Sequence, residues 1–412
     1  MKSNIAVEEM KSKEEYRDYT LGLALFDAVP VLLFLLTGVT VFLISGSRIF
    51  LAGVIASFIG GSSKVIWKLI VVIKGEDRSS LTRVFHIMLP AGFGLMLLAV
   101  IVGIVSDLTK GPVPGGRGTI SGICEAFSMM PAALFFIAGI AGMCLMGYLG
   151  SHMDDSAGSA WIEEIINTAA QLAFLAGVII VYFGLGYTAD AAAADALRGT
   201  DKVAVTETEE SYFFDGPGRD TVIVFYPGAK VEPGAYAQLM DRLAEDGADC
   251  FLCRMPADFA LFDRNMADDI KSRYDSGTLS CGENDYRHWY LAGHSLGGAA
   301  ASMMLAGSNE DEQGKWDGII FLASYPAGKT EVPALSIYGS EDGVLDHNSY
   351  EESQDKGYWP EDTEEFIIEG GNHALFGSYG FQKGDRPAEI SSESQQRQTA
   401  ETVTDWIRRK SQ

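Results

Sequence analysis

The chain has 412 residues, among them 55 acidic and 31 basic ones, which give a formal net charge of −24. Hydrophobic residues make up 47% of the chain and charged residues 21%, and this composition excludes a largely disordered protein. The acidic balance excludes nucleic acid as a partner, because phosphate contacts need a basic face, and 5 Cys are too few for a disulfide scaffold.

The first 187 residues are apolar and nearly neutral in charge. They carry 12 basic and 14 acidic side chains, whereas residues 188–412 carry 19 and 41. Five apolar runs in this part are each about the 20 residues that cross a hydrocarbon core as a helix, so we predict five membrane spans. The runs are roughly 21–45, 49–73, 84–105, 128–149 and 166–187.

The distribution of Lys and Arg predicts how the chain crosses the membrane. Five spans put residues 1–20 and the loops 74–83 and 150–165 on one side, and most of the basic side chains of this part lie there. Basic loops stay in the cytoplasm. We therefore expect a multi-pass protein of the cell membrane, with a cytoplasmic segment 1–20 and an extracellular second half. If the second span, which contains two lysines, did not insert, four spans would keep the second half in the cytoplasm.

Two of the predicted spans contain charged side chains. Asp27 lies about six residues, roughly 9 Å, inside the first span, and Lys68 reaches a similar depth in the second. Because a lone charge in hydrocarbon costs several kcal/mol, we predict that Asp27 pairs with Lys68, or alternatively with Lys64. In the other reading the lysines reach the interface without a partner. The small residues in line with the lysines, suited to close helix packing, are Ala52, Ala56 and Gly60.

After residue 187 the pattern changes to apolar strands that alternate with helices. Residues 188–202 are predicted to be a linker and residues 203–412 one domain. The predicted strands are 221–226, 249–254, 289–292, 318–323, 334–338 and 365–369, and the predicted helices are 232–246, 262–274, 296–306 and 395–409. This alternation predicts a mostly parallel sheet with helices on both faces and an active site at the carboxyl ends of the strands.

A Gly-x-Ser-x-Gly sequence stands between a predicted strand and a predicted helix. It reads Gly293, His294, Ser295, Leu296, Gly297. A strand that turns directly into a helix strains its middle residue, and side chains two positions before and after it would clash, so both are Gly. The turn lifts the Ser295 hydroxyl above the sheet, at the N-terminus of the helix. We therefore predict that Ser295 is a nucleophile rather than a bystander in a tight turn.

A serine nucleophile needs a base, and the base needs an acid that orients it. In this architecture the expected order along the chain is Ser, then Asp or Glu, then His. Asp342 lies in a Gly-bounded turn past one predicted strand, and His373 lies in a Gly-rich turn past the next. We predict a triad of Ser295, His373 and Asp342. The alternatives are Glu341 and Asp346 for the acid and, less favoured because we expect it on the surface, His347 for the base.

An oxyanion hole needs two backbone N–H groups. One is expected from Leu296, directly after the nucleophile. The other should come from the turn at 227–231, after the first central strand, with Ala229 as the predicted donor and Gly228 as the alternative. About ten residues between 323 and 334 are too few for a lid domain. The Gly-rich segment 374–390 could wall the site, or it could be an ordinary surface loop.

These motifs resemble those of the α/β-hydrolase superfamily, in particular a small bacterial branch of lidless α/β-hydrolase-fold proteins. The matching segments are Y-P-G-x-K-V at 226–231, G-H-S-L-G-G at 293–298, S-I-Y-G-x-x-D-G at 336–343 and E-G-G-N-H-A-x-F-G-x-Y-G-x-Q at 369–382. The resemblance covers residues about 203–410 and leaves out the five-span part. It implies hydrolysis, most often of carboxylic esters, and it does not fix the substrate.

The sequence therefore predicts a multi-domain protein, an all-α transmembrane region followed by an α/β-hydrolase fold. The predicted function is that of a membrane-anchored serine hydrolase of the carboxylesterase type. The alternatives are an acyltransferase with the same triad, or a membrane sensor or permease with a hydrolase-like binding module. The expected partners are a small or lipid-like acyl substrate and the lipid bilayer. We expect no cofactor and no metal, because the sequence contains no His/Asp/Glu cluster with metal-ligand spacing and no Gly-rich phosphate loop. Cys250 and Cys253 would point to opposite faces of one strand, so they cannot easily bind one metal.

Overall fold

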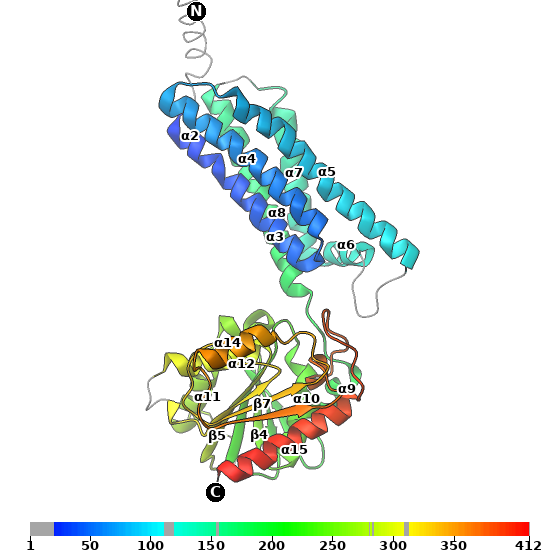
Figure 1. Cartoon of the computed structure of the whole chain (residues 1–412), viewed down its shortest axis with the longest axis vertical. Coiled ribbons are helices and arrows are strands. Elements are labelled where there is room, and N and C mark those ends of the chain that lie inside the picture. The colour runs from blue at the N-terminus through cyan, green and yellow to red at the C-terminus, as the bar shows by residue number, and fades with distance from the viewer. Residues whose placement is uncertain are drawn as a thin grey trace, which may run out of the picture. The chain divides into compact units, whose positions relative to one another are not determined.

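The structure, a computed structural model, describes residues 20–110, 119–153, 156–279, 281, 284–308 and 313–411. The chain divides into two compact units, Met1–Gly184 and Leu185–Gln412 (Figure 1). The boundary lies close to the predicted change from apolar runs to alternating strands and helices. Each unit is described by itself.

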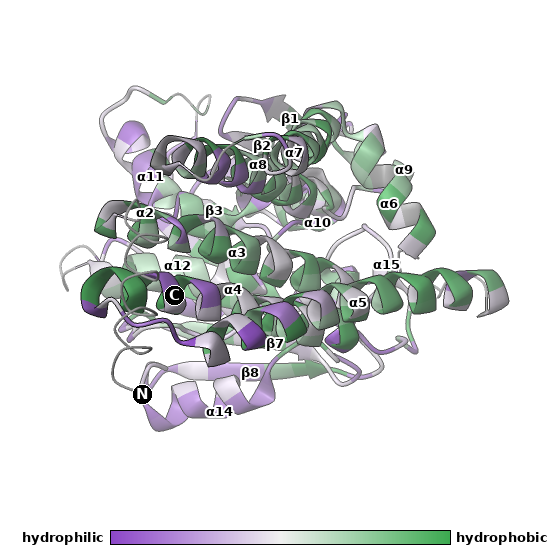
Figure 2. Ribbon diagram, turned by 90° about the horizontal axis from the view of Figure 1, so that it is seen from above, coloured by the Kyte–Doolittle hydropathy of each residue, from purple (hydrophilic) through white to green (hydrophobic). Residues whose placement is uncertain are grey.

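The first unit consists of helices in its described part. They are α2 (Leu21–Phe26), α3 (Ala28–Ser45), α4 (Arg48–Lys74), α5 (Ser79–Lys110), α6 (Thr119–Ser128), α7 (Met130–Leu149) and α8 (Ala157–Gly184). Within the described residues, five helical stretches are long and apolar enough to cross a membrane, as predicted. Figure 2 shows these helices hydrophobic over most of their length. Helix α6 was not predicted, and α8 begins well before the expected start at residue 166.

Small residues bring α4 and α5 together. A Cβ atom on Gly53 would lie 2.7 Å from the Gly92 carbonyl oxygen, and one on Gly60 would lie 2.9 Å from the Leu89 amide nitrogen. Only glycine allows backbones to approach this closely. The contact stripe on α4 therefore runs through Gly53, Ser57 and Gly60. The predicted stripe is right at Gly60 and wrong at Ala52, which is exposed.

The second unit is built on one eight-stranded sheet in the order β1-β2-β4-β3-β5-β6-β7-β8. Its strands are β1 (Ala204–Glu207), β2 (Ser211–Asp215), β3 (Thr221–Tyr226), β4 (Asp249–Cys253), β5 (His288–His294), β6 (Gly318–Leu322), β7 (Ala334–Gly339) and β8 (Thr363–Ile368). The pairs β1–β2 and β2–β4 are antiparallel and the other neighbours are parallel. The mostly parallel sheet is as predicted, and the carboxyl ends of its central strands meet at one edge.

Helices cover both faces of this sheet (Figure 1). They are α9 (Ala191–Ala196), η1 (Pro233–Tyr236), α10 (Ala237–Glu245), η2 (Pro256–Asp258), η3 (Ala260–Phe262), α11 (Met266–Asp275), α12 (Leu296–Gly307), α14 (His347–Asp355), η4 (Ala374–Phe376) and α15 (Ser392–Lys410). Successive side chains of β3 pack on opposite faces of the sheet, in two different hydrophobic cores. Ile223 packs in the core under α10 and α15, whereas Val224 packs in the core under α12. The alternation explains why β3 is an unbroken apolar run.

The segment expected to be a linker is folded. Residues 188–202 contain α9, whose Ala193 is fully buried, and they belong to the second unit, which begins at Leu185. Asp190 caps α9, since its carboxylate accepts a hydrogen bond from the Ala193 amide at 2.9 Å. The short strands β1 and β2 and the polar helix α14 are further elements that the apolar pattern did not reveal.

A cluster of three charges is buried within the first unit. Lys68 Nζ lies 2.9 Å from Asp27 Oδ2 and 3.3 Å from Glu164 Oε1, and the three side chains are 6%, 5% and 9% exposed. The predicted pair of Asp27 and Lys68 is confirmed. Glu164 joins it because α8 starts earlier than expected. Lys64, the alternative partner, instead lies over the ring of Phe85.

The first testable prediction concerns this cluster. Asp27→Lys leaves two ammonium groups beside one carboxylate, which costs several kcal/mol in an apolar surrounding. We expect the amount of monodisperse protein extracted from membranes, measured by gel filtration, to fall sharply. Adding Lys68→Asp should restore it, because one amine and two carboxylates again occupy the site. Lys64→Met is the matched control and should behave like the unchanged protein. Failure of the double variant to recover would contradict a stabilising role for the pair.

Candidate active site

The turn from β5 into α12 holds Ser295 in a strained conformation. Its φ of 53° and ψ of −126° lie outside the regions that non-glycine residues ordinarily adopt. A Cβ atom on Gly293 would lie 2.4 Å from the Gly298 amide nitrogen, and one on Gly297 would lie 2.2 Å from the Tyr226 carbonyl oxygen. Both glycines are therefore required by contact, as the spacing predicted. The half-buried Ser295 directly precedes α12, whose N-terminal amides favour developing negative charge there.

Asp342 and His373 form a buried pair. Asp342 Oδ2 lies 2.9 Å from His373 Nδ1, and the two side chains are 0% and 1% exposed. Burial by itself raises the pKa of Asp342, but the hydrogen bonds from His373 and from the Val344 and Leu345 amides outweigh it and lower the pKa below its ordinary value. Asp342 is thus an anion at neutral pH. Because Asp342 can only accept, His373 Nδ1 carries the proton, and Nε2 is the lone-pair nitrogen of the neutral ring.

The hydrogen bond expected between Ser295 and His373 is not formed. His373 Nε2 is buried and has no hydrogen-bond partner among the described residues. The residue before Ser295 does contact His373, since the ring centroids of His294 and His373 lie 4.6 Å apart. Hydrogen bonds between catalytic groups are often long before substrate binds and shorten in the complex. The free lone pair on Nε2 is the feature that a general base needs.

The turn after β3 offers one unused amide. The Gly228 N–H donates to Tyr236 Oη at 3.1 Å, and the Lys230 N–H donates to the Asp258 carbonyl at 2.7 Å. The Val231 N–H donates to the Gly228 carbonyl at 3.2 Å. No hydrogen bond between described residues uses the amide of Ala229, which is half-buried. This favours Ala229 over Gly228 as the second oxyanion donor beside Leu296.

A tyrosine that the sequence did not single out supports both sides of the site. The Tyr236 hydroxyl lies 2.8 Å from His294 Nδ1, and His294 Nε2 lies 3.1 Å from the His373 carbonyl oxygen. Burial lowers the pKa of His294, and the nearby His373 lowers it further, so the ring is neutral. Since a carbonyl only accepts, His294 Nε2 carries the proton and Nδ1 accepts from Tyr236. The chain of bonds therefore runs from Gly228 to the backbone of His373.

Asp385 is a second residue that sequence reasoning missed. Its carboxylate accepts from the Gly343 amide at 3.0 Å and from the Ala374 amide at 2.9 Å. It thereby joins the turn that carries Asp342 to the turn that carries His373. Asp385 lies 42 residues beyond Gly343 in a polar stretch, and no spacing rule could have identified it.

The other candidate residues lie apart from the pair. Asp346 caps α14 by accepting from the Asn348 amide, and His347 is exposed, as expected. Glu341 Oε2 lies 3.9 Å from Arg386 Nε, with which it forms an ion pair. In the segment 374–390, Phe376 and Tyr379 are 0% and 7% exposed and pack in the core, whereas Phe381 is 42% exposed. The ring centroid of Phe376 lies 5.6 Å from that of His294.

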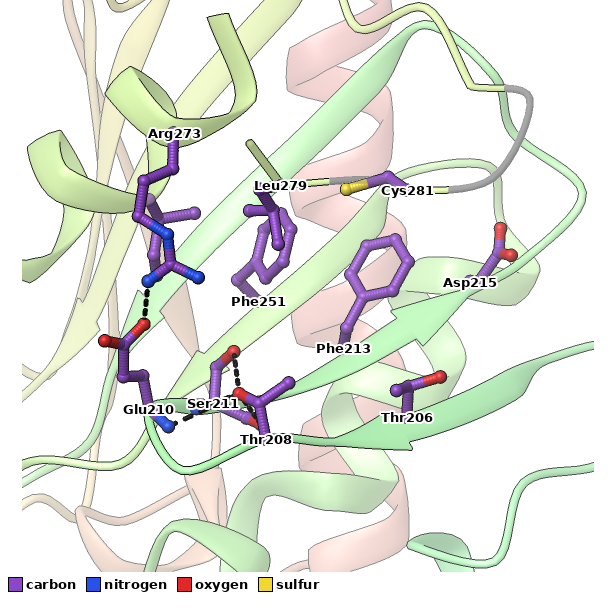
Figure 3. A pocket seen from close by; sticks show the side chains of 11 residues that line it. Thr206, Thr208, Glu210, Ser211, Phe213, Asp215, Phe251, Arg273, Leu279 and Cys281 are labelled. Carbon is purple, nitrogen blue, oxygen red and sulfur yellow. Dashed lines mark hydrogen bonds and ion pairs between the residues drawn. The ribbon is translucent and has the colours of Figure 1, made fainter. Parts of the chain in front are cut away.

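A cavity of about 150 Å³ lies elsewhere, over the edge of the sheet at β1, β2 and α11 (Figure 3). Phe213 and Phe251 line it, and Arg273 pairs with Glu210 at its rim. None of its residues comes from the carboxyl ends of β3, β5 or β7, so it is separate from the Ser295 site.

The two cysteines of β4 face opposite cores, as predicted. Cys250 packs under α10 and Cys253 packs in the core under α12. Burial raises the pKa of both thiols, so they stay protonated. Within the described residues no group of three or more His, Cys, Asp or Glu side chains is placed to hold a metal ion.

Comparison with known families agrees with this architecture. Residues 222–397 match the model of the alpha/beta hydrolase family. The match contains Ser295, Asp342 and His373, and the eight-stranded, mostly parallel sheet is consistent with it. The sheet of the second unit is therefore consistent with an α/β-hydrolase fold, and the five apolar helices of the first unit precede it in the chain.

Solved structures that resemble the chain include an esterase/lipase from an uncultured bacterium. It is 13% identical over 53% of this chain and 88% of its own, with a TM-score of 0.38. The protein TT1662 from Thermus thermophilus is 15% identical over 50% of this chain and 98% of its own, with a TM-score of 0.35. Comparison with curated proteins finds no significant match.

The second testable prediction concerns Tyr236. Tyr236→Phe leaves the Gly228 amide and His294 Nδ1 buried without partners, and each orphaned group costs about 1–3 kcal/mol. We expect a lower melting temperature of the second unit, followed by tryptophan fluorescence. Tyr358→Phe, which removes a hydroxyl outside this network, is the control and should melt like the parent. Equal melting temperatures of the two variants would show that the hydrogen bonds of Tyr236 do not stabilise the site.

Proposed function

We propose that this chain is a membrane-anchored serine hydrolase that cleaves a carboxylic ester or a related acyl substrate. The observation that carries the proposal is the strained turn at Ser295, which directly follows His294, together with the buried pair of His373 and Asp342, whose histidine ring contacts that of His294. A strained backbone conformation of this kind costs about 1–3 kcal/mol, and such conformations cluster at active sites, where they serve the mechanism. A module that only bound ligands would gain nothing from it.

The reaction follows from the protonation states. Ser295 Oγ attacks the acyl carbonyl while His373 Nε2 accepts its proton, and the resulting imidazolium is stabilised by the Asp342 carboxylate. The protonated Nε2 then gives the proton to the leaving alcohol, so that an acyl-enzyme remains. Water, deprotonated by the same nitrogen, attacks the acyl-enzyme and releases the acid.

The negative oxygen of each tetrahedral intermediate needs two donors. The amides of Leu296 and Ala229 are the proposed pair, and the N-terminus of α12 adds a favourable dipole. His294 does not compete as a base, because its Nε2 is protonated and bound to the His373 carbonyl. Its part is to hold the backbone of the catalytic histidine in place.

We further propose that the five-helix unit anchors the protein in the cell membrane and that the hydrolase domain lies on the extracellular side. The support is the number of apolar helices, together with the excess of Lys and Arg on one side of them. A lipid-like acyl ester is the substrate class that a membrane anchor suits best.

The third testable prediction is the loss of ester hydrolysis in Ser295→Ala. Removing the nucleophile of a triad lowers kcat by about 10³-fold or more while the fold is kept. Full-length protein in detergent would be assayed with p-nitrophenyl acetate and butyrate, with circular dichroism as the check on folding. Ser276→Ala, at an exposed turn, is the matched control. Residual turnover of Ser295→Ala near the parent value would exclude Ser295 as the nucleophile.

The fourth testable prediction is external placement of the domain. Protease added to intact cells or spheroplasts should degrade the second unit, while a cytoplasmic marker protein stays whole. Permeabilised cells serve as the control in which both are degraded. A hydrolase domain that stays protected until lysis would favour the four-span arrangement.

A further inference from the structure

Residues 186–190, which follow α8 and are called the strap, run along the turn at 227–231 that carries Ala229. The Tyr187 N–H donates to the Lys230 carbonyl at 2.6 Å, and the Glu232 N–H donates to the Tyr187 carbonyl at 2.8 Å. Together they form a parallel bridge with Val231. A Cβ atom on Gly186 would lie 2.9 Å from the Lys230 carbonyl oxygen, so this close approach requires glycine. The strap therefore fixes one side of the turn that carries Ala229.

The same strap also holds the loop beyond His373. The Lys383 N–H donates to Tyr187 Oη at 3.3 Å, and the Tyr187 ring lies 5.5 Å from the ring of Tyr379. The Asp190 N–H donates to the Ser378 carbonyl at 2.8 Å. Residues 228–232 and 378–383, which flank the site from different parts of the chain, thus share one support.

Lys230 shows why the turn needs this support. Its φ is 62°, the left-handed conformation, which costs a non-glycine residue about 1–2 kcal/mol. Hydrogen bonds hold it from two directions, since its N–H donates to the Asp258 carbonyl and its carbonyl accepts from Tyr187. Because Lys230 directly follows Ala229, the bonds that hold Lys230 also restrict the turn that carries the Ala229 amide.

Aromatic contacts lead from the strap to the catalytic histidine. The ring of Tyr379 lies 5.5 Å from Tyr187 and 6.3 Å from Tyr236. The Tyr236 hydroxyl in turn bonds to His294, which bonds to the His373 backbone. A shift of Tyr187 would therefore reach both the oxyanion turn and the base.

We propose that Tyr187 is a positioning residue for the reaction described under Proposed function, on which this inference rests. Through the strap it holds the Ala229 amide and the loop after His373 in their working geometry. Only Leu185 and Gly186 separate Tyr187 from the end of α8 at Gly184, and the strap lies outside the family match at 222–397. Catalysis in this chain thus depends on the segment that joins the apolar helices to the hydrolase domain.

The test compares full-length Tyr187→Ala with Tyr187→Phe. Both variants keep the backbone bonds of residue 187 and lose the bond from the Lys383 amide to Oη, and only Tyr187→Phe keeps the ring that contacts Tyr379. Both are assayed in detergent on p-nitrophenyl butyrate, and their melting temperatures are recorded. Loss of one oxyanion donor costs about 10²–10³ in kcat, so its displacement should lower kcat of Tyr187→Ala about tenfold or more. KM should stay within about twofold, because the lost interaction acts on the transition state. Tyr187→Phe should stay within about twofold of the parent in both constants.

The decisive arm is rescue by Lys230→Gly. Glycine adopts a positive φ without the steric cost, so the turn no longer needs the strap to hold it. In the Lys230→Gly background, Tyr187→Ala should lower kcat less than about threefold. If Tyr187→Ala is obtained only unfolded, Tyr187→Leu, which keeps apolar bulk without the aromatic contact, takes its place with the same expected pattern.

Other results would overturn the inference. They are an unchanged kcat in Tyr187→Ala, a change in KM alone, an equal loss in Tyr187→Phe, or no rescue by Lys230→Gly. A parent protein that hydrolyses none of the esters would instead contradict the proposed function itself.

Discussion

The tight passage of the chain from β5 into α12 is the constraint on which the site depends. Backbone atoms fill the space beside Gly293 and Gly297, and between these two glycines Ser295 adopts a positive φ. The surrounding sheet supplies the restraint: the Ser295 amide donates to the Leu322 carbonyl at 2.9 Å, and the Ser324 hydroxyl donates to the Ser295 carbonyl at 2.6 Å. A serine held in this way cannot relax into the sheet, and its hydroxyl stays at the strand ends.

A second rule shapes both units, namely that a buried polar group must have a partner. In the second unit it produces the chain of bonds through Tyr236 and His294 and the bridge made by Asp385. In the helical unit it produces the cluster of Asp27, Lys68 and Glu164, in which one ammonium serves two carboxylates. His373 Nε2 is one of several buried atoms that have no hydrogen-bond partner among the described residues. That nitrogen is where the proposed reaction needs an available lone pair.

Much of this arrangement could be predicted from the sequence, because the signals are local. The strand β3 is an apolar run buried on both faces, and the glycines around Ser295 mark a strand-to-helix turn. The missed elements lack such signals. The strand β1 is short and largely exposed, and Tyr236 acts through His294, 58 residues away. The sequence did not point to Glu164, because this residue precedes the apolar run 166–187 that predicts the fifth span. Long-range polar contacts of this kind leave no periodicity in the sequence.

The most direct test of the account is the identity of the residue that a fluorophosphonate modifies. Such a reagent reacts with a serine only where a base and an oxyanion hole activate it. Full-length protein in detergent would be treated, digested and mapped by mass spectrometry, with heat-denatured protein as the control. The account predicts a single adduct on Ser295, absent from the denatured sample. No adduct on the folded protein, or an adduct on another residue with Ser295 unmodified, would contradict it.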